Sequence, residues 1–167
     1  PMKKHVIALS LAALASGTVF AQANDTLAKI KSKGEITLGV RDSSGALSYT
    51  IGDGKYVGFH TEMAEVIAAD IQKQLGLPKL TVNKQLVTSQ NRIPLVVNGT
   101  VDLECGSTTN NTARQKDVAF AVTTYVEEVR IAVRADSGIT SIKDLNGKNV
   151  ATTTGTTSVQ TLRKNER

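Results

Sequence analysis

Strand-like and helix-like segments alternate along the first part of the chain, and this order restricts the possible folds more than any other feature. Alternating apolar residues predict strands at 35–40, 80–87 and 101–105. Apolar residues at three- and four-residue spacings predict a long helix between the first two strands and a shorter helix between the last two. Such an order requires parallel strands joined by right-handed crossovers. We therefore expect an α/β fold with a mainly parallel sheet.

Polar residues mark where the helices should begin and end. Asp25 is a good N-cap for a short first helix, which Gly34 should end. Thr61 is positioned to cap the long helix, and Ser89 or Asn91 to cap the shorter one.

Residues 1–23 have the layout of a secretory signal peptide. Two lysines precede an apolar run over residues 6–15, and small residues follow at a cleavage site after Ala21 or Ala23. The alternative is a membrane anchor, but the run is shorter than the ~20 residues that span a bilayer. We therefore expect export to the periplasm and cleavage.

Composition argues against a nucleic-acid partner. The net charge of +5 falls to +3 without Lys3 and Lys4, no basic block is present, and aromatic residues make up 4% of the chain. The single cysteine, Cys105, cannot close an intrachain disulfide and ends an apolar strand, which favours burial. We expect a monomer that binds no nucleic acid.

The second part of the chain indicates that one lobe ends and another begins. Residues 24–125 contain the alternating pattern and would form a first lobe, and residues 126–133 are interpreted as a linker strand or hinge. Residues 134–167 would then begin a second lobe, in which a strand at 149–153 and a turn at Gly155 lead into a helix. The sequence stops within the opening turns of that helix, which suggests a fragment with an incomplete second lobe.

Polar clusters follow the expected ends of three strands. Ligands of open parallel sheets gather at the carboxyl ends of strands, so we expect these clusters to line one cleft. The clusters are Arg41 with Ser43 and Ser44, Ser89 with Arg92, and a polar loop, residues 107–112, that is followed by Arg114.

The chemistry of these clusters suits an anion. A helix N-terminus offers unpaired N–H groups, and the sequence suggests one after Gly106 and another after Gly155. The planar guanidinium of Arg114 matches a carboxylate in two hydrogen bonds. The expected carboxylate ligands come from two sides of the cleft, with Ser107, Thr109 and Arg114 on one side and Thr156 or Thr157 on the other. Such a site would close on a small ligand as a clamp.

Arg41 and Arg92 would add positive charge to the same cleft, which favours a dicarboxylate over a neutral ligand. Each arginine by itself is better explained as a solvated surface residue, because most charged side chains are solvated. It is their coincidence at one edge of the expected sheet that supports a binding site.

Groups suited to catalysis are sparse. His60 precedes the long helix without an evident Ser or Asp partner, and we expect it at the surface or at the boundary of the core. Two acidic pairs, Asp102 with Glu104 and Glu127 with Glu128, have no neighbouring His or Cys at metal-ligand spacing and are interpreted as solvated charges or as helix and strand edges. We therefore expect no catalytic residue, no metal and no cofactor.

Residues 88–120, "TSQNRIPLVVNGTVDLECGSTTNNTARQKDVAF", closely resemble the first lobe of the periplasmic solute-binding proteins of polar amino-acid ABC transporters (family 3). The resemblance is strongest to the glutamate/aspartate-binding group. The strand followed by S-x-T-x-x-x-x-R is also similar to the ligand domains of ionotropic glutamate receptors. The resemblance implies a periplasmic-binding-protein-like type II fold, which is a two-lobed clamp.

The resemblance also implies a ligand, a partner and residue roles. The ligand would be glutamate or aspartate, delivered to a membrane permease. Ser107 and Thr109 would contact it and Arg114 would hold its α-carboxylate. Its side-chain carboxylate would be held by Arg41, Ser89 and Arg92, and the second lobe would contribute the Gly-Thr-Thr at 155–157.

The chain departs from the family in two respects. His60 stands where many members have an acidic residue after Gly-Phe. Members are also about double this length, so the resemblance implies that a partner for Cys105 and a group for the ligand's ammonium lie in a missing part. Two alternatives stay open, namely a periplasmic enzyme on the same fold, such as a dehydratase of cyclic acids, and a ligand-sensing domain.

Overall fold

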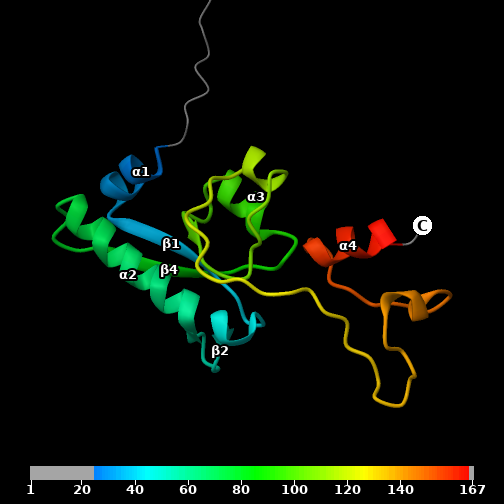
Figure 1. Cartoon of the computed structure of the whole chain (residues 1–167). Helices are drawn as coiled ribbons and strands as arrows, with labels where there is room; N and C mark the ends of the chain where they lie inside the picture. The colour runs from blue at the N-terminus through cyan, green and yellow to red at the C-terminus, as the bar shows by residue number, and fades with distance from the viewer. Residues whose placement is uncertain (1–24, 166–167) are drawn as a thin grey trace, which may run out of the picture.

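A three-stranded parallel sheet forms the centre of the computed structural model, which describes residues 25–165. Strand β1 (Glu35–Val40) lies between β4 (Thr81–Leu86) and β5 (Leu103–Glu104) (Figure 1). The parallel pairing confirms the α/β prediction. The expected signal peptide and its cleavage site lie outside the described residues.

Three helices accompany the sheet. They are α1 (Thr26–Lys33), α2 (Phe59–Gln74) and α3 (Arg92–Val97). The crossover through α2 runs from β1 to β4, and the crossover through α3 runs back past β1 to β5. Because both crossovers are right-handed, they place α2 and α3 on opposite faces of the sheet (Figure 1). Asp25 caps α1 by accepting a hydrogen bond from the amide of Ala28 at 3.1 Å, as predicted.

One face of β1 carries the hydrophobic core. Alternate residues of this strand point toward α1 and α2, because successive side chains of a strand point to opposite faces. The fully buried members are Ile36, Leu38 and Val40 of β1, Ile30 of α1, and Ala64 and Ala68 of α2. The small alanines let α2 lie close to the strand.

An ion pair joins α1 to the residue that precedes β5. Asp102 is 3% exposed, forms an ion pair with Lys29 at 2.5 Å and accepts a hydrogen bond from the amide of Thr37 at 2.9 Å. Of the two expectations for Asp102, a solvated charge is wrong, whereas a place at a strand edge is confirmed because Asp102 directly precedes β5. Its carboxylate joins α1, β1 and the segment that leads into β5.

A hairpin and a short 3-10 helix cover one end of the sheet. They are η1 (Gly45–Leu47), β2 (Tyr49–Thr50) and β3 (Tyr56–Val57). The buried Ser48 hydroxyl lies 2.8 Å from the Thr61 hydroxyl and accepts a hydrogen bond from the Arg41 amide at 2.9 Å. Thr61 is therefore not the cap of α2, which begins at Phe59 with Gly58 as its N-cap. The side chain of Thr61 fixes the hairpin instead.

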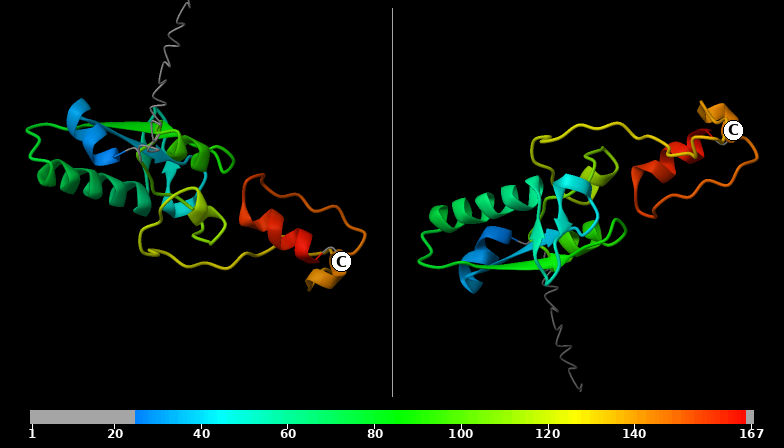
Figure 2. Two further views of the ribbon diagram at one scale, coloured as in Figure 1. Left: turned by 90° about the horizontal axis from the view of Figure 1, so that it is seen from above. Right: turned by 90° about the horizontal axis from the view of Figure 1, so that it is seen from below.

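Beyond η2 (Arg114–Lys116) the chain runs as an extended segment to η3 (Ile142–Leu145) and α4 (Thr157–Asn165) (Figures 1 and 2). The strands expected at 126–133 and 149–153 do not form in the described structure. A strand needs a neighbour to accept and donate its ladder hydrogen bonds, and no described segment pairs with either one. Among residues 25–165, no helix combines the length and the apolar character needed to cross a bilayer.

Candidate ligand-binding site

The strand order brings two of the expected polar clusters together. Strands β1 and β5 are neighbours, and the chain passes from β1 outward to β4 before it crosses back to β5 on the other side. Open α/β sheets bind ligands where the strand order reverses in this way. Arg41 directly follows β1, and the polar loop directly follows Gly106 at the end of β5.

Arg41 is 7% exposed and all of its guanidinium nitrogens donate hydrogen bonds. Nε donates to the Ser44 hydroxyl at 3.0 Å, Nη1 to the Val87 carbonyl at 2.7 Å and Nη2 to the Ser89 hydroxyl at 3.2 Å. The side chain thus ties the end of β1 to the loop after β4, and it joins Arg41 and Ser89 as the sequence predicted.

The other clusters connect to Arg41 through hydroxyl groups. The Ser44 and Ser107 hydroxyls lie 2.9 Å apart, and Nη1 of Arg92 donates to the Ser107 hydroxyl at 3.5 Å. The structure therefore gathers Arg41, Ser89, Arg92 and Ser107 into one network, which we call the arginine network and which includes Ser44.

Arg92 is 3% exposed, and its Nε has no hydrogen-bond partner in the described structure. Burial is the main cause that lowers the pKa of Arg92 to about 10. The charge of Glu104 raises it, and Arg114 and Arg41 lower it further. The guanidinium is still protonated at neutral pH, so the network contains a buried cation with an unused donor.

Glu104 is the carboxylate among these arginines. One oxygen, Oε2, accepts a hydrogen bond from the Thr108 hydroxyl at 2.6 Å, and the other has no hydrogen-bond partner among the described residues. Gly106 packs against that second oxygen so closely that a side chain there would collide with it. For Glu104 as well, the expectation of a solvated charge is wrong and that of a strand edge is confirmed, because Glu104 is the last residue of β5. The register pairs Glu104 with Gly39, so its side chain lies on the face opposite the core.

Arg114 holds the polar loop and also contacts the second unit, which is the part of the chain that contains η3 and α4. Nη1 donates to the Thr109 carbonyl at 2.9 Å, and Nη2 donates to the Gly155 carbonyl at 3.0 Å. Burial lowers the pKa of Arg114, and the charge of Glu104 opposes this effect. No helix begins directly after Gly106, contrary to expectation, because the first helical turn starts at Arg114.

Gly155 lies against the loop that contains Ser89. Its φ is +79°, and a Cβ atom there would stand 2.6 Å from the Ser89 carbonyl oxygen. Thr157 begins α4, as predicted, and the Thr156 hydroxyl donates to the Thr153 carbonyl at 2.7 Å. The turn at Gly155 therefore brings Thr156 and Thr157 to the edge of the arginine network. No hydrogen bond joins either residue to it in the described structure.

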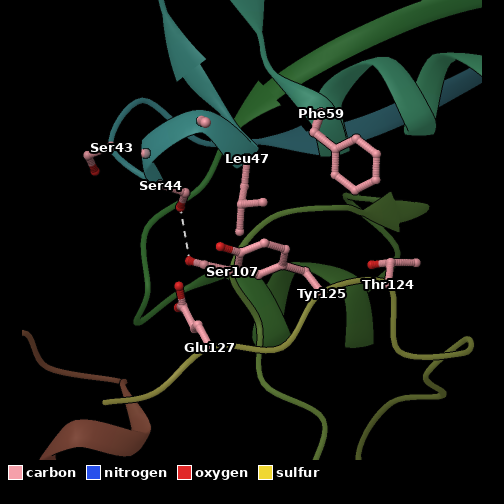
Figure 3. A pocket seen from close by; sticks show the side chains of 10 residues that line it. Ser43, Ser44, Leu47, Phe59, Ser107, Thr124, Tyr125 and Glu127 are labelled. Atoms are coloured by element: carbon pink, nitrogen blue, oxygen red, sulfur yellow. Dashed lines mark hydrogen bonds between the residues drawn. The ribbon is translucent and has the colours of Figure 1, made fainter. Parts of the chain in front are cut away.

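A pocket of about 640 Å³ adjoins this network at Ser107 (Figure 3). Its wall contains apolar side chains, hydroxyls and one carboxylate, contributed by η1, the start of α2, the polar loop and the extended segment. The lining residues are Ser43, Ser44, Gly45, Ala46, Leu47, Phe59, Ser107, Thr124, Tyr125 and Glu127. Sequence patterns did not indicate Thr124, Tyr125 and Glu127 because they belong to no motif or regular element.

Two further residues border the site. His60 is 6% exposed, which excludes the surface and leaves the other expected place, the boundary of the core. Its ring nitrogens contact Gly106 and Thr124. Cys105 is half-buried, and burial together with Glu104 raises the pKa of its thiol to about 11. Cys105 is thus partly rather than fully buried, and its raised pKa agrees with the predicted lack of a reactive thiolate.

Comparison with known proteins agrees with this arrangement. Residues 36–167 match the model of the bacterial extracellular solute-binding proteins, family 3. The chain is 48% identical to the L-glutamate/L-aspartate-binding protein of Pseudomonas aeruginosa, over 92% of this chain and 51% of that protein. It is 42% identical to the glutamate/aspartate import solute-binding protein of Escherichia coli strain K12, over 98% of this chain and 56% of that protein. The chain thus spans about half the length of the curated relatives it matches.

A solved structure shows the same fold. The ancestral amino acid-binding protein AncCDT-1, described as a precursor of cyclohexadienyl dehydratase, is similar with a TM-score of 0.70 and 28% identity. The similarity covers 84% of this chain and 60% of that one. Together with the family model it confirms the type II periplasmic-binding-protein fold. The chain belongs to the bacterial extracellular solute-binding proteins, family 3.

Proposed function

We propose that this protein binds glutamate or aspartate outside the cytoplasm and delivers it to the permease of an ABC importer. One observation carries the proposal, namely that three arginines and several hydroxyls meet at the carboxyl end of one sheet. The charges of Arg41 and Arg114 both act on Arg92, and Glu104 is the carboxylate that acts on it with the opposite sign. Arg41 and Arg92 also donate hydrogen bonds to serine hydroxyls at this end of the sheet. The excess of positive charge suits a ligand with two carboxylates.

Arg114 holds the ligand's α-carboxylate in this proposal. Both of its terminal nitrogens now donate to neutral backbone carbonyls, of Thr109 and Gly155. A carboxylate accepts both hydrogen bonds at once and adds an opposite charge, so it forms stronger contacts than two neutral oxygens. Ligand binding would therefore replace the present contacts of Arg114.

Arg92 holds the side-chain carboxylate. A buried donor without a partner costs about 1–3 kcal/mol, and the unpaired Nε of Arg92 is such a donor. A carboxylate that reaches this guanidinium recovers that cost and neutralises a desolvated charge. A neutral amide can accept a hydrogen bond but does not neutralise the charge, so we expect a preference for glutamate over glutamine.

Arg41 and Ser89 support Arg92 rather than replace it. The nitrogens of Arg41 are all engaged with Ser44, Val87 and Ser89, so Arg41 contributes its charge and fixes the Ser89 hydroxyl. Thr156 and Thr157 complete the site from the second unit when the two sides close.

The similar proteins support the same ligand class. The two curated relatives are named for glutamate and aspartate, and the similar solved ancestor is itself named as an amino acid-binding protein. We therefore propose a periplasmic, non-enzymatic role. The dehydratase alternative would need a general acid or base in the cleft, where Glu127 is the carboxylate that lines the pocket.

Titration calorimetry with glutamate, aspartate and glutamine tests the proposal, on the chain from residue 24 and on the full product of its gene. We expect binding of both acids, at least tenfold tighter than that of glutamine. Arg92→Ala should weaken glutamate binding much more than glutamine binding. Arg134→Ala is the matched control, because Arg134 is exposed and pairs with Asp136. Equal losses for both ligands would contradict the role of Arg92.

A further inference from the structure

His60 is a buried histidine that contacts two distant parts of the chain. It lies in the first turn of α2, and its Nδ1 is 2.6 Å from the carbonyl oxygen of Gly106. Its Nε2 is 2.9 Å from the hydroxyl oxygen of Thr124. The imidazole therefore bridges the end of β5 and the extended segment that leaves for the second unit.

These contacts define the state of the neutral ring. A carbonyl oxygen can only accept a hydrogen bond, so Nδ1 must carry the proton and donate to Gly106. Nε2 is then unprotonated and accepts from the Thr124 hydroxyl, which can rotate to donate. The neighbouring ring of Phe59, whose centroid is 5.1 Å away, packs beside the imidazole.

Both contacts of His60 adjoin groups of the binding site. Gly106 precedes Ser107, whose hydroxyl touches Ser44 and Arg92, so the direction of the Gly106 carbonyl affects where Ser107 points. Thr124 and Ser107 both line the pocket, with Phe59 beside them (Figure 3). A single side chain thus connects the start of the polar loop to the segment between the two units.

We propose that His60 is a positioning residue for amino-acid binding. Its Nδ1–H group holds the Gly106 carbonyl so that Ser107 stays directed into the site, and its Nε2 ties that loop to Thr124. The bridge makes the polar loop and the extended segment move together when the clamp closes. This role rests on the proposed function, and it would explain why a histidine stands at the first turn of α2.

Nitrogen NMR of the histidine ring tests the contacts without any ligand. The chain contains two histidines, His5 and His60, so a chain that starts at residue 24 gives one set of imidazole signals. We expect the neutral tautomer with the proton on Nδ1. A ring with the proton on Nε2, or an averaged signal typical of a solvated imidazole, would overturn the bridge.

Substitutions test the effect on binding. His60→Leu removes both hydrogen bonds and should weaken glutamate binding at least tenfold. His60→Asn places an amide donor near the position of Nδ1 and should restore affinity to within about threefold of the wild type. Rescue by Asn separates positioning from packing, because Asn fills the site less well than Leu. Affinity of His60→Leu equal to the wild type would overturn the proposal.

Thr124 offers a second route if His60→Leu does not fold. Thr124→Val removes the hydroxyl and keeps the shape, and we expect a threefold to tenfold loss of affinity, whereas Thr124→Ser should bind as the wild type does. Equal binding by Val and Ser variants would count against the Thr124 contact. Failure of the wild type to bind any amino acid overturns the proposed function and the ligand role of His60 together. The ring tautomer would still report whether the bridge exists.

Discussion

Arg114 and Gly155 are joined by a 3.0 Å hydrogen bond from guanidinium Nη2 to the carbonyl oxygen, across 41 residues of chain. The same guanidinium holds the Thr109 carbonyl through Nη1. The group proposed to bind the ligand carboxylate therefore also connects the polar loop to the second unit.

Arg114→Ala should abolish detectable amino-acid binding, because the ligand carboxylate would lose its bidentate partner. Arg114→Lys keeps the charge but not the planar fork, and we expect affinity to fall by about 1–3 kcal/mol relative to the wild type. Titration calorimetry measures both, with Arg130→Ala as a control at an exposed site. Retained affinity in Arg114→Ala would refute the carboxylate assignment.

Glu104→Gln should increase the preference for glutamate over glutamine. The carboxylate of Glu104 raises the pKa of both Arg92 and Arg114, so it already offsets part of the positive charge that attracts the ligand. An uncharged amide of similar shape can still accept from Thr108 and leaves more charge for the ligand. We expect at least a threefold rise in the ratio of the two affinities, measured side by side. A ratio that stays constant or falls would contradict this prediction.

Asp102→Asn should destabilise the fold without a direct effect on the site. The substitution breaks the ion pair with Lys29 and leaves a partly buried ammonium with the Gly99 carbonyl as its remaining partner. We expect the free energy of unfolding in urea to fall by about 2–4 kcal/mol. Asp136→Asn, at an exposed pair with Arg134, should leave the unfolding midpoint unchanged. Equal midpoints for the two variants would refute the structural role of Asp102.

Cys105 should make stability decrease at alkaline pH. Its thiol pKa is raised to about 11 in the folded chain from an ordinary value of 9.0, so the stabilisation is complete below pH 9. As pH rises from 9 to 11 the unfolded state loses the proton first, and about 2–3 kcal/mol of stability should be lost. Urea unfolding at pH 8, 9, 10 and 11 measures this loss, which Cys105→Ala should lack. A parallel pH dependence in both proteins would show that other groups cause it.

The sequence predicted local structure well where local chemistry determines it. β1 has the expected bounds because its alternating residues pack on two different faces, and Gly34 ends α1 as a C-cap in the left-handed region. Thr61 shows the limit of such reasoning. A threonine near a helix start is a typical cap, but a tertiary partner, Ser48, takes its hydroxyl.

Which polar residues lie together could be predicted better than the contacts that they make. Strand order alone places Arg41 near Ser107, so their meeting could be predicted. The burial of Asp102 and Glu104 could not, because it depends on cations that other elements supply, Lys29 in one case and Arg92 in the other. Strand formation at 126–133 likewise depends on a neighbouring strand rather than on the segment itself.

The extended segment after η2 has a consequence for digestion by proteases. Residues 121–137 are exposed, and the backbone amides of residues 119–135 donate no hydrogen bond to other described residues. Proteases bind their substrates as extended chain with free backbone groups, so this stretch already has the shape that trypsin needs at Arg130 and Arg134. Mild digestion should therefore first separate α4 and η3 from a fragment that keeps the whole parallel sheet and most of the arginine network.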